Sequence, residues 1–263
     1  MPNVLSKLGA EVLAVNPFVS TAGMLGYDRS SHAAQVAALV TASGADLGGD
    51  RPQRRPADLV DGDGAVLSDT EALFAFLELL DGVGTAGGAT VALPVNAPRA
   101  AEQIVRAHGL ELRWTKTSAP SLMADAEEPG VAFAMNLEGG VILPEFMPAF
   151  DAAAGLLKLL DLLTIREMSL SDVRAGLPTA RREGVGGDPL GGQGVVMRTL
   201  VEQTQGRDVE LIDGVKVNHD HGWVLVLPDP EEPTTHIWAE GDSAAEAKAL
   251  TQEYARRLRQ MMR

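Results

Sequence analysis

Short apolar runs and segments of helical periodicity alternate through the middle of the chain, between residues 90 and 163. The apolar runs predict buried strands, and apolar residues that recur every three or four positions predict helices that cover them. In order, these elements are strand Thr90–Pro94, helix Pro98–His108, strand Leu110–Lys116, helix Pro120–Glu127, strand Val131–Asn136 and helix Met147–Leu163. Such alternation is typical of a sheet with helices on both faces.

The first eighty residues predict a smaller set of elements. The glycine-rich piece Gly82–Gly88 follows them and predicts a linker at a domain boundary. Gly49–Pro56, rich in arginine and proline, has the period of neither a strand nor a helix. The predicted elements are a helix ending at Gly9, strand Glu11–Val15, helix His32–Ser43, strand Ala45–Gly48, a hairpin turning at Asp61–Gly64 and helix Asp69–Leu80.

The last fifty residues predict three strands followed by a helix. A tight turn at His219–Gly222 separates the first two strands. Pro228–Pro233 is predicted to be a loop, because its three prolines cannot donate hydrogen bonds to a sheet. Asp242 and Ser243 open the final amphipathic helix. Before this unit, the predicted elements are a capped helical turn at Ser169–Leu177, an irregular segment at Arg181–Gly194 and helix Val195–Gln205.

Composition narrows the class of protein. The chain has 263 residues, a formal net charge of −14 and a pI near 4.7, so nucleic acid and anionic membrane surfaces are not expected partners. No apolar run reaches the roughly 20 residues that a membrane-spanning helix needs. The amino terminus lacks the features of a signal peptide, and the chain has no cysteine. We therefore expect a cytoplasmic protein.

Several stretches carry a resemblance to a known family. In the C-terminal unit they are Asp213-Gly214-Val215-Lys216, Gly222-Trp223-Val224-Leu225 and Glu232-Pro233. In the middle of the chain they are Trp114-Thr115-Lys116-Thr117, Met135–Gly140 and Pro144-Glu145-Phe146. In this order they resemble the α-D-phosphohexomutases, the family of phosphomannomutase and phosphoglucomutase. The chain looks closest to the mutase-like C-terminal part of bacterial fusion proteins with a mannose-1-phosphate guanylyltransferase.

The resemblance implies a fold class and a division into domains. The implied class is α/β, with three-layer α/β/α domains that contain mixed sheets, one partial and one complete. A C-terminal α+β domain with an antiparallel, TBP-like sheet completes it. Residues 1–81 would be part of the family's second domain, residues 82–190 the third, and residues 191–263 the fourth. The first domain, which carries the phosphoserine loop, has no counterpart here, so we expect an amino-terminally truncated module.

The resemblance also implies a chemistry, the interconversion of hexose 6-phosphate and hexose 1-phosphate through a phosphoserine and Mg²⁺. Where the magnesium loop is due, Asp50 stands among arginines, which oppose a divalent cation, so no retained Mg²⁺ is expected. Asp61–Gly64 looks like that loop, but its spacing suits a plain hairpin turn. In the phosphate loop, the family's Arg, Ser and Thr are replaced by Leu227, Asp229 and Glu231, which supply no cation.

Three residues remain as candidates for substrate binding, and none is predicted to be catalytic or to bind a metal. Lys116 stands where the family places a phosphate-contacting lysine, although an ordinary solvated lysine fits the same position. Asn136 and Glu138 occupy the sugar loop, where their oxygens could accept hydrogen bonds from sugar hydroxyls. His219 and His221 could hold a metal, but no third ligand is evident, and solvated turn residues are the simpler reading.

We therefore expect a phosphohexomutase-like module of GDP-mannose biosynthesis that binds a hexose phosphate and is inactive alone. A nucleotidyltransferase domain or subunit is a further possible partner. The alternative from another class is a non-catalytic module that regulates a mannose-1-phosphate guanylyltransferase. A fragment without function is a third reading.

Overall fold

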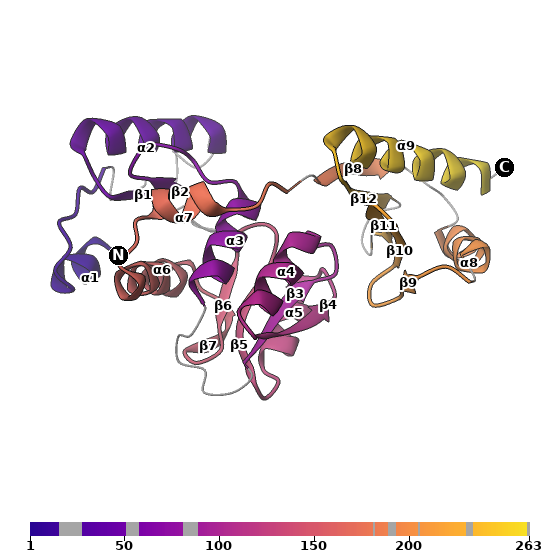
Figure 1. The fold of residues 1–263 in the computed structure, drawn as a ribbon, viewed down its shortest axis with the longest axis horizontal. Coiled ribbons are helices and arrows are strands. Elements are labelled where there is room, and N and C mark those ends of the chain that lie inside the picture. Colours follow the sequence, from indigo (N-terminus) through magenta and orange to yellow (C-terminus); the bar gives the residue numbers. More distant parts are fainter. Residues whose placement is uncertain are drawn as a thin grey trace.

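The computed structural model describes residues 1–15, 28–50, 58–80, 89–180, 182–188, 193–204, 206–229 and 234–261. Figure 1 shows an amino-terminal group of helices with a two-stranded sheet, a central α/β body, and a carboxyl-terminal sheet covered by one long helix. The predicted irregular segment Gly49–Pro56, the linker Gly82–Gly88 and the proline-rich loop lie largely outside the described residues. No helix in the described part of the chain is both long enough and apolar enough to cross a bilayer.

The amino-terminal region contains a small antiparallel sheet packed under a helix. This helix is α2 (Arg29–Ser43). Asp28 caps it by accepting a hydrogen bond from Ser31 N, and Gly44 ends it in the left-handed conformation (φ 67°). The predicted strand Glu11–Val15 is wrong, because these residues form neither helix nor strand. The elements are α1 (Pro2–Lys7), α2 (Arg29–Ser43), β1 (Leu47–Asp50), β2 (Asp58–Asp61) and α3 (Asp69–Leu79).

The central body is built on a five-stranded mixed sheet of order β4-β3-β5-β6-β7. β4, β3 and β5 are parallel, and β6 and β7 continue antiparallel. The strands are β3 (Thr90–Pro94), β4 (Glu111–Thr115), β5 (Val131–Met135), β6 (Val141–Leu143) and β7 (Met147–Phe150). The helices are α4 (Arg99–Ala107), α5 (Ala119–Ala126), α6 (Ala152–Arg166) and α7 (Leu170–Gly176).

Helices cover both faces of this sheet, as the sequence predicted. On one face, α3, α4, α6 and α7 share a core with Leu93 and Phe133. On the other face, Leu122 of α5 packs against Ala134 and Ile142. Although α3 belongs to the first eighty residues, seven of its eleven residues are buried in the central core. Hydrophobic packing therefore joins the amino-terminal region to the central body.

One predicted helix in this body is partly wrong. Residues 147–150 form strand β7, and α6 begins only at Ala152. Asp151 caps α6, since its carboxylate accepts hydrogen bonds from Ala153 N (2.8 Å) and Ala154 N (3.1 Å). A short apolar run such as Met147–Phe150 has no period that separates strand from helix, so the sequence alone does not divide it from the helix that follows.

The carboxyl-terminal part is an antiparallel sheet of order β8-β12-β11-β10-β9, which confirms the predicted α+β unit. On the face that α9 covers, Val217 and Val224 of the sheet are buried in one core with Tyr254 of α9. On the opposite face, Trp223 and Leu225 pack with Val95 of the central body. The elements are β8 (Arg182–Asp188), α8 (Gln193–Gln203), β9 (Val209–Glu210), β10 (Val215–His219), β11 (Gly222–Pro228), β12 (Thr235–Gly241) and α9 (Ala244–Met261).

β8 corrects the prediction that Arg181–Gly194 is irregular. Its glycines argue against a strand by propensity, but Gly184 faces Trp238 on the neighbouring strand β12. A Cβ on Gly184 would lie 2.9 Å from Cδ1 of that indole. The glycine therefore makes room for a large cross-strand neighbour.

Candidate functional site at the carboxyl edge of the central sheet

The candidate binding residues lie where the parallel strands of the central sheet end. Lys116 follows β4, Asn136 follows β5, and β3 lies between these two strands. At about 4.8 Å between strands, β4 and β5 are roughly 10 Å apart. In open α/β sheets, ligands bind outside the carboxyl ends of the strands. The structure thus brings Lys116 and the loop with Asn136 and Glu138 to the carboxyl edge of the parallel strands, where ligands bind in such sheets.

The loop after β5 is held by Asn136. Its Oδ1 accepts hydrogen bonds from Glu138 N (3.1 Å) and Gly140 N (2.7 Å), and its backbone N donates to Gly140 O (3.0 Å). Gly140 is buried against Phe150, and a Cβ there would lie 2.7 Å from that ring. Asn136 was predicted to offer an oxygen to sugar hydroxyls, but this oxygen is used by the loop itself. The Nδ2 donor of Asn136 and the exposed carboxylate of Glu138 are the groups that can face a ligand.

Asn96 adds a polar group at the same edge that the sequence analysis missed. It follows β3, it is 7 % exposed, and its buried Oδ1 has no hydrogen-bond partner in the described part of the chain. An unpaired buried oxygen is costly, so this group could accept a hydrogen bond from a ligand at this edge. A polar residue two positions after a buried strand is the sequence signal that could have found it.

The carboxyl-terminal sheet is fastened to this edge beside Lys116. Thr117 donates two hydrogen bonds to Asp213 Oδ2, from its N (2.8 Å) and its Oγ1 (2.7 Å). Gly214 then turns the chain with φ 67°, where a Cβ would lie 2.3 Å from Val226 O. Asp213 and Gly214 therefore build the junction between the two sheets.

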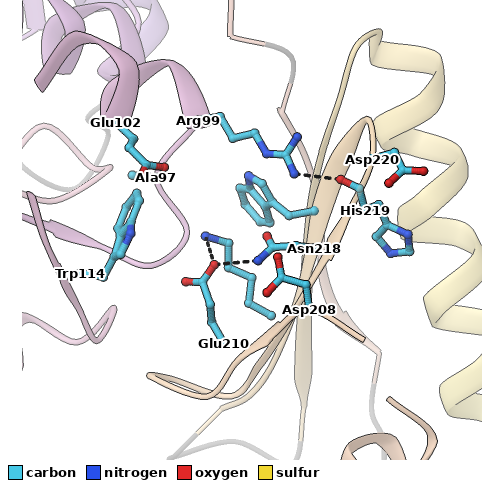
Figure 2. Close-up of a pocket in the computed structure, with 11 residues that line it drawn as sticks. Ala97, Arg99, Glu102, Trp114, Asp208, Glu210, Asn218, His219 and Asp220 are labelled. Atoms are coloured by element: carbon cyan, nitrogen blue, oxygen red, sulfur yellow. Dashed lines mark hydrogen bonds and ion pairs between the residues drawn. The ribbon is translucent and has the colours of Figure 1, made fainter. Parts of the chain in front are cut away.

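A second contact between the sheets surrounds a cavity of about 320 Å³ (Figure 2). Lys216 lies inside it, with Nζ 4.8 Å from the Trp114 ring centroid and 5.2 Å from that of Trp223. Burial lowers the pKa of Lys216, and Glu210, whose Oε1 lies 3.4 Å from Nζ, partly opposes this shift. Asn218 donates to the same Glu210 oxygen at 2.9 Å.

Arg99 and Glu240 close this contact. Arg99 Nη2 donates to His219 O (2.9 Å) and Gly222 O (2.6 Å), as Figure 2 shows in part. Glu240 Oε2 accepts from Arg99 N (2.9 Å) and Trp223 Nε1 (2.5 Å). Since Pro98 offers no side-chain cap to α4, Glu240 supplies the acceptor at that helix terminus from 141 residues away.

Comparison with known proteins shows which proteins this chain resembles in sequence and fold. No protein-family model matches the chain. A probable phosphoglucosamine mutase of Methanopyrus kandleri is 29 % identical over 266 residues, which cover 96 % of this chain and 57 % of the relative. A phosphoglucomutase/phosphomannomutase family protein of Burkholderia thailandensis has the same fold, with a TM-score of 0.74 at 22 % identity, over 88 % of this chain and 50 % of that one. The chain is a homologue of the α-D-phosphohexomutases.

This phosphohexomutase homologue spans about half the length of the relatives it matches. A third match is N-acetylphosphoglucosamine mutase of Aspergillus fumigatus, solved in complex with GlcNAc-6P and magnesium. It has a TM-score of 0.59 at 12 % identity, over 79 % of this chain and 47 % of that one. Family neighbours thus bind magnesium and hexose phosphates.

The described residues of this homologue do not fit a magnesium site. Asp61 is a turn residue, as predicted: its Oδ1 accepts from Asp63 N (3.1 Å) and Ala65 N (2.8 Å), and its Oδ2 pairs with Arg174 Nε. Among the residues with a described placement, no three His, Cys, Asp or Glu side chains gather as metal ligands would. The side chain of Asp50 and residues 51–57 lie outside the description, so the predicted loss of the magnesium loop stays a prediction.

The other loops of the homologue are engaged in structural contacts. Asp229, in the phosphate loop, pairs with His236 Nε2 (2.9 Å), and its N donates to Thr234 O. Glu231 falls outside the described residues. His219 Nε2 lies 3.2 Å from Tyr254 OH, whereas His221 Nδ1 pairs with Asp242 (2.8 Å). The two histidines thus have different partners, and the prediction that they hold no metal stays a prediction.

Proposed function

We propose that this chain is a phosphohexomutase-like module that binds a hexose phosphate at the carboxyl edge of the central sheet. Lys116 would bind the phosphate, and Asn136 Nδ2 and the carboxylate of Glu138 would form hydrogen bonds with sugar hydroxyls. The observation that carries the proposal is the convergence of Lys116 and the Asn136 loop at one edge of parallel strands. The names of the relatives, which are mutases of hexose and hexosamine phosphates, support the same ligand class.

We further propose that the module does not turn its ligand over by itself. Phosphoryl transfer needs cations and donors around the moving group, and it is mainly positioning and charge neutralisation. The carboxylate of Asp61 is already used by protein donors, and Asp229 offers a negative charge where the family has a donor. Such a module would act in the supply of sugar phosphates for nucleotide-sugar synthesis. The resemblance suggests GDP-mannose as the nucleotide sugar.

Replacing Lys116 with alanine tests the binding site. We expect mannose 1-phosphate, titrated by calorimetry, to bind at least about tenfold more weakly to Lys116→Ala than to the unmodified chain, because a hydrogen bond to a charged group contributes about 1.5–3 kcal/mol. The matched control is Lys248→Ala, which removes another exposed lysine from the outer helix α9. Equal affinity of Lys116→Ala and the unmodified chain would refute the assignment of Lys116.

A further inference from the structure

A second cavity, of about 520 Å³, lies away from the edge that carries Lys116. One wall comes from α3, α7 and the segment after α7, and the opposite wall comes from β8 and β12. None of the candidate sugar-phosphate residues lines it. The charged, hydroxyl-bearing and indole side chains that line it are Ser68, Thr70, Glu71, Arg174, Thr179, Arg182 and Trp238.

Arg182 is the unusual group in this cavity. Its Nε is buried without a hydrogen-bond partner, and no ion pair to its guanidinium is found among the described residues. Desolvation lowers the pKa of Arg182 to about 10, while the charge of Glu240 acts in the opposite direction. The group is therefore still cationic at neutral pH. Glu240 is the cross-strand neighbour of Arg182, but no ion pair between them is found among the described residues. A largely desolvated guanidinium with an unpaired Nε is costly, so an anion bound in the cavity would stabilise it.

Apart from Glu71, the other polar side chains of the cavity can donate hydrogen bonds to an anion. The carboxylate of Glu71 is already occupied, since Oε2 accepts from Ser68 N (2.8 Å) and Ser68 Oγ (2.7 Å) in the capping box of α3. Arg174 contacts the fully buried Asp61 through its Nε, and no hydrogen bond of its other N–H groups is found among the described residues. Thr70 and Thr179 add two hydroxyl groups to the lining.

We propose that this cavity binds a phosphate monoester, with Arg182 as its principal cation and Arg174, Thr70 and Thr179 as further donors. Guanidinium groups bind carboxylate and phosphate through paired N–H donors, and the three oxygens of a phosphate suit donors that arrive from opposite walls better than the two of a carboxylate. Because those walls belong to the central body and to the carboxyl-terminal sheet, the bound anion would connect the two parts. This site is independent of the proposed function at Lys116.

The three tryptophans of the chain give a site-specific readout. Trp238 lines this cavity, whereas Trp114 and Trp223 line the cavity around Lys216. We expect titration of the ¹⁵N-labelled chain with inorganic phosphate, and separately with glucose 6-phosphate, to shift the indole N–H signal of Trp238. Glucose, which has no charge, should not shift it. A tighter response to the ester than to inorganic phosphate would identify a phosphorylated metabolite as the natural class, and the reverse order would identify free phosphate.

Variants separate this site from others. Arg182→Gln should weaken the response of Trp238 at least about tenfold, because it removes the charge from the hydrogen bonds. The matched control Arg106→Gln, at an arginine whose side chain is 73 % exposed, should have no effect. Lys116→Ala should also leave the Trp238 response unchanged, so failure here and failure of the proposed function can be told apart. The proposal is overturned if millimolar phosphate leaves the Trp238 signal of the unmodified chain in place, or if Arg182→Gln, folded by circular dichroism, responds as the unmodified chain does.

Discussion

Asp61→Ala is expected to lower the free energy of unfolding by about 3–5 kcal/mol, because it leaves several hydrogen-bond donors unpaired, at a cost of about 1–3 kcal/mol for each buried one. Asp61 is fully buried, and its carboxylate closes the hairpin after β2 through Asp63 N and Ala65 N. The same carboxylate binds Arg174 of α7. Alanine would leave two backbone donors and a guanidinium without their acceptor. Urea unfolding followed by circular dichroism measures the change.

Two variants bracket this result. Asp63→Ala removes an exposed carboxylate from the same turn and should change the free energy of unfolding by less than about 0.5 kcal/mol. Asp61→Asn keeps the oxygen that accepts from Asp63 N and Ala65 N but loses the negative charge, so it should fall between the other two. If Asp61→Ala is as stable as Asp63→Ala, the carboxylate does not hold the hairpin to α7.

Glu240→Ala is expected to cost about 2–4 kcal/mol, because it removes an ionised acceptor from two hydrogen bonds. Trp223 is fully buried, and its Nε1 would lose its acceptor in the interior. Arg99 N, at the start of α4, would lose the acceptor that links the central body to the carboxyl-terminal sheet. We expect the unmodified chain to unfold in one transition and Glu240→Ala to unfold in two, with the carboxyl-terminal sheet unfolding first.

The fluorescence of the tryptophans, compared with far-ultraviolet circular dichroism during urea unfolding, reports this separation. Glu240→Gln keeps an oxygen acceptor without the charge and should retain coincident transitions at a lower midpoint. Glu246→Ala, at an exposed position on α9, serves as the matched control. Coincident transitions at unchanged midpoints in Glu240→Ala would show that this carboxylate does not couple the two parts.

The central strands could be predicted because strands buried on both faces consist of continuous apolar runs. Thr90–Pro94 is a compact apolar run, and the structure has a strand with those bounds. β7 and β8 could not be predicted in the same way. Met147–Phe150 is too short to show a period, and the strand character of Gly184 depends on Trp238, which lies 54 residues later.

Part of the candidate site could likewise be predicted from the sequence, and part could not. Lys116 and Asn136 could be placed at one edge from the sequence, since parallel strands carry their carboxyl ends to the same side. The use of Asn136 Oδ1 inside its own loop could not be foreseen, because it depends on local backbone geometry. The pairing of Glu240 with Arg99 joins elements that only the packing of two sheets brings together.

Phosphorus NMR of one sample tests the central claim most directly, that this homologue binds a hexose phosphate without turning it over. The sample contains the chain, mannose 1-phosphate, Mg²⁺ and a catalytic amount of a hexose 1,6-bisphosphate. We predict that the 1-phosphate signal broadens or shifts as protein is added, and that no 6-phosphate signal develops over hours. A growing 6-phosphate signal would contradict the absence of turnover, and a 1-phosphate signal unaffected by the protein would contradict the binding.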